Sequence, residues 1–137
     1  MNADAVLNLL SISRENGSEY CVAAHSAVAD AVSQVPREVV DAIREDRPFA
    51  DLRMGVLSGF TRTMITSQGR MTRDDIAAFY AVGFSREQVL EIVLAIAVAT
   101  MSNYTNLRFA TNIESSLASR KWTSFAKRRR VACTAQE

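Results

Sequence analysis

Cys21 and His25 are the residues whose types and spacing could carry out chemistry. Residues 16–26 read NGSEYCVAAHS and contain one of the two cysteines and the only histidine of the chain. If Ser18 is the N-cap of a helix, Cys21 occupies the third helical position, where free backbone N–H groups stabilise an anion such as a thiolate. His25 lies one turn further along the same face and can accept the thiol proton. This spacing predicts a pair of nucleophile and base.

The same residues also allow simpler interpretations. A Cys on an apolar helix is commonly a small core residue, and a single His is commonly a surface or hydrogen-bonded polar group. A Ser nucleophile at Ser18 or Ser26 would need a base and an acid that the sequence does not indicate. Two possible ligands without further His or Cys cannot complete a zinc site, so we expect no metal and no cofactor.

The elements that must position these residues are predicted to be helices. No Asp-Gly pair occurs, and no sustained alternation of apolar and polar residues flanks Asn16-Gly17 or indicates strands elsewhere. Capping residues, glycines and apolar spacing predict helices over residues 5–15, 18 to about 34, 37–45, 51–67 and 73–82, a longest helix that starts after Ser85, and a short helix over 112–119. We therefore expect an all-α, single-domain bundle of six to seven helices.

The longest predicted helix is apolar on all sides from Val89 to Val98. A helix without a polar face is expected in the centre of its domain or of an oligomer. The surrounding apolar stretch, from Val89 to Met101, is interrupted by Glu91 and is shorter than the roughly 18 residues that a membrane span requires. The N-terminus has no basic region typical of a secretory signal. We expect no membrane partner and a cytoplasmic protein with reduced thiols.

Charge is distributed unevenly along the 137 residues, although the net charge is only +1. The composition is ordinary for a globular domain and excludes a disordered chain or a disulfide scaffold. Six of the sixteen basic residues lie near the C-terminus, at Arg120, Lys121, Lys127, Arg128, Arg129 and Arg130. We therefore divide the chain into a helical domain, 1–119, and a basic tail, 120–137. Because no aromatic residues interleave with the basic run, we expect a solvated tail and no nucleic-acid partner.

Residues 18–26 resemble the Cys-x-x-Cys-x-x-x-His core of the alkylhydroperoxidase D-like branch of the carboxymuconolactone decarboxylase family. The resemblance continues in RPFAD at 47–51, in AVGFS at 81–85 and in SNYTN at 102–106, where the longest helix ends. It covers about residues 8 to 116. The order of these segments makes it more specific than the Cys and His spacing alone.

The resemblance implies an alkylhydroperoxidase D-like helical domain that assembles into trimers or hexamers. It also implies a thiol-dependent peroxidase or disulfide reductase active in antioxidant defence, with a peroxide or disulfide as substrate. In such a protein the Cys that matches Cys21 attacks the peroxide, and the His that matches His25 relays protons. The first Cys of the motif resolves the sulfenic acid as a disulfide. Decarboxylase members of the family act on a lactone and typically lack this pair of cysteines.

The chain departs from the family pattern at two positions. Ser18 stands at the first Cys, the resolving position, and a hydroxyl cannot form a disulfide. A sulfenate on Cys21 would need an external thiol reductant or Cys133 to resolve it. Val6 stands where the family often has a proton-carrying Glu. The alternatives to a peroxidase are therefore a non-catalytic oligomeric scaffold or binding protein, and a carboxymuconolactone-decarboxylase-like enzyme.

The polar end of the longest helix has two possible roles. Asn103, Tyr104 and Asn106 follow its apolar stretch. Their side chains could satisfy unpaired backbone carbonyls and neighbouring polar groups. They could instead line a pocket at Cys21.

Overall fold

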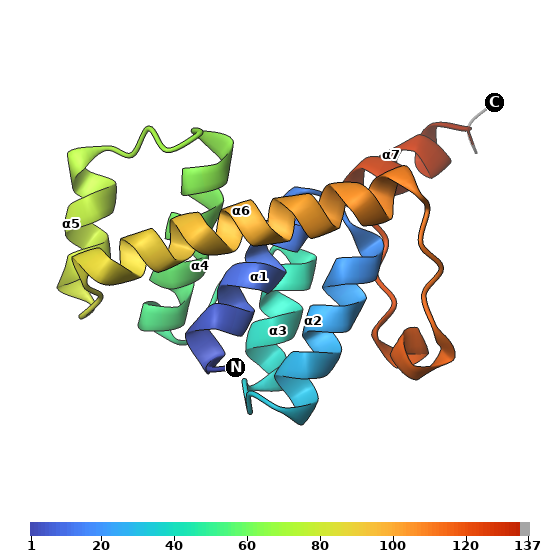
Figure 1. Ribbon diagram of the computed structural model, residues 1–137, viewed down its shortest axis with the longest axis horizontal. Helices are drawn as coiled ribbons and strands as arrows, with labels where there is room; N and C mark the ends of the chain where they lie inside the picture. The colour runs from blue at the N-terminus through green and yellow to red at the C-terminus, as the bar shows by residue number, and fades with distance from the viewer. Residues whose placement is uncertain (135–137) are drawn as a thin grey trace.

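The computed structural model describes residues 1–134, with side chains described as far as Arg129, and this part of the chain is helical without strands (Figure 1). The all-α prediction is confirmed. The described residues form seven α-helices and one 3-10 helix, whereas six to seven helices were expected. They are α1 (Ala3–Glu15), α2 (Glu19–Ala31), α3 (Arg37–Glu45), α4 (Leu52–Thr66), α5 (Arg73–Ala81), α6 (Arg86–Arg108), the 3-10 helix η1 (Ser115–Arg120) and α7 (Phe125–Thr134).

Helix α1 is the central helix of the bundle. It packs against α2, α3, α4 and α6. Its apolar residues Val6, Leu7 and Leu10 are fully buried in the core. Its polar residues are buried as well, and the hydroxyl of Ser11 lies 2.8 Å from that of Ser58 on α4. Paired polar groups of this kind allow a helix to be enclosed on several sides.

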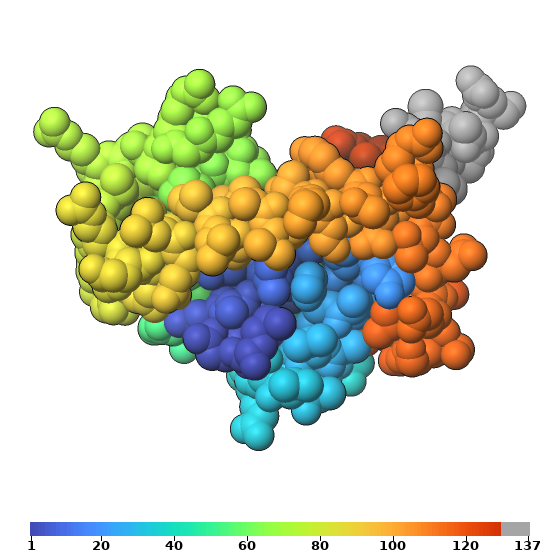
Figure 2. All heavy atoms as spheres, in the orientation of Figure 1, coloured from blue at the N-terminus to red at the C-terminus, as the bar shows by residue number. Residues whose placement is uncertain are grey.

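Helix α6 lies on the outside of the bundle, so residues 89–98 are not in the centre of the domain. The other expected place, the centre of an oligomer, stays a prediction. Only Ile92, Ala99 and Asn103 of α6 are buried, and Figure 2 shows the helix as a continuous ridge across one face. Only one side of α6 contacts α1 and α2, so most of its apolar side chains remain uncovered. By length and composition α6 could also cross a membrane, although core helices of soluble proteins satisfy the same criterion.

Capping residues set most helix boundaries as predicted. Thr72 begins α5 and Ser85 begins α6, each through a complete capping box. Asp51 caps α4 by accepting from the backbone N–H of Met54 at 2.8 Å. Helix α3 has the expected bounds and follows Pro36.

Two predicted boundaries are wrong. Helix α2 ends at Ala31 rather than near Gln34, because Gln34 has a left-handed backbone with φ of 50° and cannot continue a helix. The last short helix does not begin after Asn112. It is a 3-10 helix whose N-cap is Glu114.

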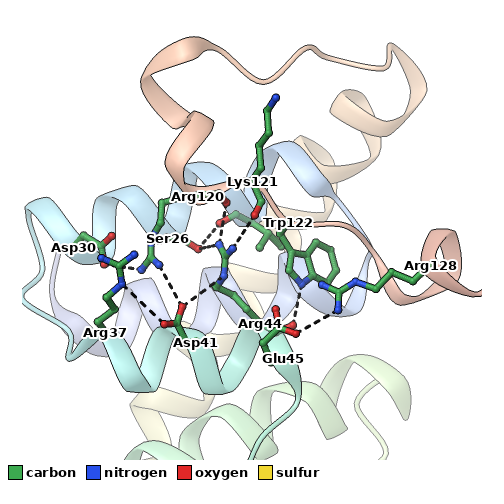
Figure 3. A network of polar contacts seen from close by, with 11 residues as sticks. Ser26, Asp30, Arg37, Asp41, Arg44, Glu45, Arg120, Lys121, Trp122 and Arg128 are labelled. Carbon is green, nitrogen blue, oxygen red and sulfur yellow. Dashed lines mark hydrogen bonds and ion pairs between the residues drawn. The ribbon is translucent and has the colours of Figure 1, made fainter.

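The segment after η1 is fixed to α3, although a solvated tail was expected from residue 120. Trp122 is buried, and its indole Nε1 donates to the backbone carbonyl of Arg44 at 2.8 Å. The guanidinium of Arg44 in turn donates to the backbone carbonyls of Arg120 and Lys121, both at 2.9 Å (Figure 3). The first residues of the expected tail are therefore part of the packed structure.

Two carboxylates compensate the buried charge of Arg120. Its guanidinium contacts Asp30 of α2 at 2.7 Å and Asp41 of α3 at 3.2 Å. Arg44 lies beside the same cluster, 3.8 Å from Asp41, and donates to the hydroxyl of Ser26 at 2.9 Å. Figure 3 shows these side chains converging between α2, α3 and the η1 segment. The pairing offsets the cost of burying two guanidinium groups.

Candidate functional site

Cys21 occupies the predicted position in the first turn of α2. Ser18 is the N-cap residue, Glu19 is the first helical residue, and Cys21 is the third. The N–H of Val22 donates to the carbonyl of Ser18 at 2.9 Å, so the preceding N–H groups have no partner within the helix. Cys21 thus lies where the helix end favours negative charge.

Ser18 fills the N-cap position without capping the helix. Its side chain makes no cap hydrogen bond, and its buried Oγ has no hydrogen-bond partner among the described residues. The residue is 1% exposed. An unpaired buried hydroxyl is energetically unfavourable. Ser18 is thus the N-cap residue, as predicted, but its hydroxyl makes no cap hydrogen bond.

The sulfur of Cys21 has polar neighbours on α6. The side-chain amide of Asn106 donates to Sγ at 3.3 Å, and the hydroxyl of Ser102 lies 3.7 Å from it. Asn106 also donates to the backbone carbonyl of Ser102 at 3.0 Å, which orients its amide. Cys21 is only 3% exposed, but its sulfur is not enclosed by hydrocarbon alone. An amide donor beside the sulfur is a polar contact that a cysteine packed in hydrocarbon lacks.

The three polar residues at the end of α6 divide between the two expected roles. Asn106 contacts Cys21. Asn103 is fully buried, accepts from the side chain of Asn16 at 2.9 Å and donates to the hydroxyl of Ser13 at 3.1 Å. Tyr104 is 60% exposed. Asn103 thus fixes α6 against the end of α1. In this position of α6, the side chain of Asn106 reaches the sulfur of Cys21.

Ser102 is a neighbour of Cys21 that sequence reasoning missed. It stands four residues before Asn106 on the same helix. Residues at this spacing share one face, so their polar side chains could have been assigned to one site together. The run SNYTN was noted for its resemblance to the family, but Ser102 was not singled out as a side chain of the site.

His25 lies on α2 one turn after Cys21, as predicted, and is partly buried. No hydrogen bond joins it to Cys21 among the residues that the structure describes. Burial lowers the pKa of His25 below its ordinary 6.5. The imidazole is therefore neutral at pH 7 and has a free lone pair for a proton.

A cavity of about 760 Å³ opens beside the first turn of α2. Ser18, Tyr20 and Asn106 line it together with Lys121 and Lys127 from the C-terminal segment. Cys21 does not line the cavity itself, but Asn106, which contacts its sulfur, does.

Carboxylates set the charge at the rim of this cavity. Tyr20 donates to Glu114 at 3.2 Å, and the negative charge of Glu114 raises the pKa of the phenol. Glu19 accepts from the backbone N–H of Ser124 at 3.1 Å and pairs with Lys127 at the same distance. These contacts join the start of α2 to the C-terminal segment and hold the rim in place.

Sequence comparisons do not place this chain among known proteins. No protein-family model matches it, and no curated protein shows significant similarity to it. The argument for function therefore depends on the residues around Cys21. Among the described residues, no group of three His, Cys, Asp or Glu side chains could hold a metal ion. The side chain of Cys133, the alternative resolving thiol, lies outside the described residues.

Proposed function

We propose that this chain is a thiol-dependent peroxidase or disulfide reductase in which Cys21 is the nucleophile. The observation that supports this most directly is the amide of Asn106, which donates to Sγ at 3.3 Å. The first turn of α2 adds a positive electrostatic potential at the same sulfur. The thiolate is the reactive form of a cysteine, and reactive cysteines lie in polar surroundings such as a helix N-terminus.

His25 is the proton partner in this proposal. The neutral imidazole takes the thiol proton, and the thiolate attacks one oxygen of the peroxide. An S–O bond forms and the O–O bond breaks, which gives a sulfenic acid and an alkoxide. The alkoxide takes the proton back from His25 and leaves as an alcohol. Sulfur loses two electrons and the peroxide gains them.

An external thiol completes the cycle, since Ser18 carries no sulfur at the resolving position. The thiol attacks the sulfenic acid, forms a mixed disulfide with Cys21 and releases water. A second thiol then attacks the mixed disulfide. This step restores the Cys21 thiol and releases a disulfide formed from the two external thiols. The proposal includes a cytoplasmic location, where reduced thiols are abundant.

The burial of Cys21 restricts the substrate to small molecules. At 3% exposure the sulfur is reached only when a side chain at the cavity moves. Asn106 both contacts the sulfur and lines the cavity of about 760 Å³, so in this proposal its rotation connects the two. Hydrogen peroxide and small alkyl hydroperoxides fit this constraint better than a bulky lipid hydroperoxide.

Peroxide consumption in the presence of dithiothreitol tests the proposal. We expect turnover by the unmodified chain and by Cys133→Ser, and none by Cys21→Ser. Dimedone should label Cys21 after peroxide treatment, because it reacts with sulfenic acids. Ser18→Cys should supply the missing thiol and form a disulfide with Cys21 under peroxide. Absence of both turnover and dimedone labelling would rule out the peroxidase.

A non-catalytic oligomeric role is the second candidate. It is favoured by the absence of a thiol at Ser18 and by the lack of a described hydrogen bond between His25 and Cys21. This alternative predicts no turnover with any reductant while the assembly persists in Cys21→Ser. A lactone decarboxylase predicts activity that survives loss of Cys21.

A further inference from the structure

The cavity beside the first turn of α2 is larger than a small peroxide requires. Its volume is about 760 Å³, and pockets for organic ligands typically measure roughly 300–1,000 Å³. Residues from three segments that are far apart in the sequence line it, 17–20, 106–113 and 121–127. Hydrogen peroxide alone would leave most of this volume unfilled. The cavity therefore has room for a second reactant of the proposed cycle.

The start of α2 leaves polar groups unpaired at this cavity. Glu19 and Tyr20 both line it, and neither has an acceptor for its backbone N–H among the described residues. Ser18 lines it as well, and its buried hydroxyl is equally without a partner in the described part of the chain. An N-cap side chain ordinarily satisfies one of these N–H groups, but Ser18 makes no such bond. These donors are available to an acceptor that a ligand supplies.

Lys121 adds an uncompensated positive charge to the cavity. Its ammonium has no ion pair or hydrogen bond with the described residues, and Figure 3 shows its side chain extending away from the charged cluster drawn there. The other charges at the cavity are paired. Lys127 contacts Glu19 at 3.1 Å, and Glu114 at the rim accepts from Tyr20 at 3.2 Å. The charge left for a ligand to neutralise is therefore positive.

Asn106 brings the contents of the cavity close to the sulfur. Its side chain lines the cavity and donates to Sγ of Cys21 at 3.3 Å. A molecule in the cavity is thus separated from the sulfur by the thickness of one side chain. Leu107, Ile113 and Trp122 provide apolar lining for the carbon skeleton of such a molecule. The cavity combines a place near the sulfur with an apolar wall and a positive charge.

We propose that this cavity binds the external thiol that reduces Cys21, and that this thiol carries a carboxylate. The carboxylate lies beside Lys121 and accepts from the first N–H groups of α2, since an ammonium and a helix N-terminus both attract an anion. The unpaired N–H groups of Glu19 and Tyr20 equal in number the two oxygens of a carboxylate. The inference rests on the proposed peroxidase cycle, which needs an external thiol because Ser18 has no sulfur.

The bound thiol reacts with the sulfenic acid that the peroxide leaves on Cys21. Its sulfur attacks Sγ, an S–S bond forms and the S–O bond breaks, and the thiol proton leaves with the hydroxide as water. A second thiol of the same kind attacks the sulfur of the first, and its proton passes to Cys21. The two external thiols depart as their disulfide. Together they lose the two electrons that the sulfenic acid gains.

Amide chemical shifts in a Cys21→Ser, Cys133→Ser background test the binding without any redox step. Titration with 3-mercaptopropionate should shift the amide signals of Glu19 and Tyr20 until they saturate. The uncharged methyl ester of the same thiol should leave both signals in place. Equal shifts from the two compounds, or none from either, would overturn the proposal.

The charge of Lys121 is tested by Lys121→Gln in the same background. The variant should raise the dissociation constant of 3-mercaptopropionate about fivefold, as expected for loss of one exposed ion pair. It should keep the fold, because only the backbone carbonyl of Lys121 takes part in the contact with Arg44. Arg86→Gln serves for comparison, since Arg86 is exposed at the start of α6 and lies outside the cavity, and it should bind as before. Equal weakening in both variants would contradict a site at Lys121.

Steady-state reduction of peroxide tests the role of the bound thiol as reductant. Lys121→Gln should raise the KM for 3-mercaptopropionate about fivefold and leave the KM for the methyl ester and both kcat values unchanged. Because only the protein changes, the different intrinsic reactivities of the two thiols cancel. Turnover with a KM that Lys121→Gln does not alter would overturn this inference and leave the peroxidase intact. Binding without turnover by either thiol would overturn the proposed function, and the reductant role with it.

Discussion

The side-chain amide of Asn106 on α6 donates to Sγ of Cys21 on α2 at 3.3 Å, across 85 positions of sequence. This contact distinguishes Cys21 from an ordinary core cysteine, whose sulfur would be surrounded by apolar groups. It also depends on Asn103, which fixes α6 to the end of α1 one turn earlier. The surroundings of one sulfur on α2 are therefore set by the packing of two other helices.

Asn106→Leu is expected to slow alkylation of Cys21 at pH 7 about tenfold. A hydrogen bond to a charged group contributes roughly 1.5–3 kcal/mol, and 1.4 kcal/mol corresponds to a factor of ten. Iodoacetamide kinetics in a Cys133→Ser background measure the effect. Asn112→Leu is the control, because Asn112 is an exposed residue of the cavity rim. Equal rates in both variants would show that the amide does not activate the sulfur.

Ser18→Ala should leave the free energy of unfolding unchanged or raise it. Loss of an N-cap Ser usually costs about 1 kcal/mol, but Ser18 makes no cap hydrogen bond and its hydroxyl is unpaired. Ser85→Ala is the matched comparison, since Ser85 accepts from the backbone N–H of Gln88, and it should show the usual cost. Urea denaturation measures both. A similar loss at the two sites would contradict the described geometry.

His25 should make the protein less stable as the pH falls below neutrality. Burial lowers the pKa of His25 in the folded state, so the unfolded chain binds more protons between that pKa and 6.5. This contribution to stability is complete above pH 6.5 and is lost as the pH falls through the folded pKa.

Urea midpoints between pH 7.5 and pH 5 measure the effect of His25. Within this window the carboxylates of the chain remain largely ionised. His25→Gln removes the titrating group and should flatten the dependence on pH. The same slope in both proteins would show that His25 has no part in it.

Arg120→Ala is expected to destabilise the fold by about 3 kcal/mol. It removes the buried cation shared by Asp30 and Asp41. Asp41 keeps Arg44 nearby, whereas Asp30 is left without an ion pair among the described residues. Arg37→Ala is the control, because Arg37 also pairs with Asp41 but at 4.0 Å and with a 69% exposed side chain. It should change stability by less than about 0.5 kcal/mol. Chemical denaturation of the two variants separates the buried pair from the exposed one.

Local signals predicted the helices well, because capping and apolar spacing act within a few residues. The Thr72 and Ser85 capping boxes and the bounds of α3 agree with the structure. The position of Cys21 in the third helical place followed from the same kind of signal. These features require no knowledge of distant contacts.

Distant contacts were the source of the errors. The apolar content of α6 does not reveal how many helices cover it, so its burial was overestimated. Arg120 and Trp122 were assigned to the solvated basic tail, because their partners on α2 and α3 are distant in the sequence. Spacing likewise placed His25 one turn from Cys21 but could not indicate whether a hydrogen bond joins them.

The hydrogen bonds from Arg44 to the backbone carbonyls of residues 120–121 also bear on the order in which the structure forms during synthesis. Arg44 leaves the ribosome early, yet the carbonyls that receive its guanidinium are synthesised more than 70 residues later. Until then the guanidinium of Arg44 has only Ser26 and Asp41 as partners among the contacts described. These hydrogen bonds can therefore form only after residues 120–121 have been synthesised, and a chain that stops at residue 119 would lack them.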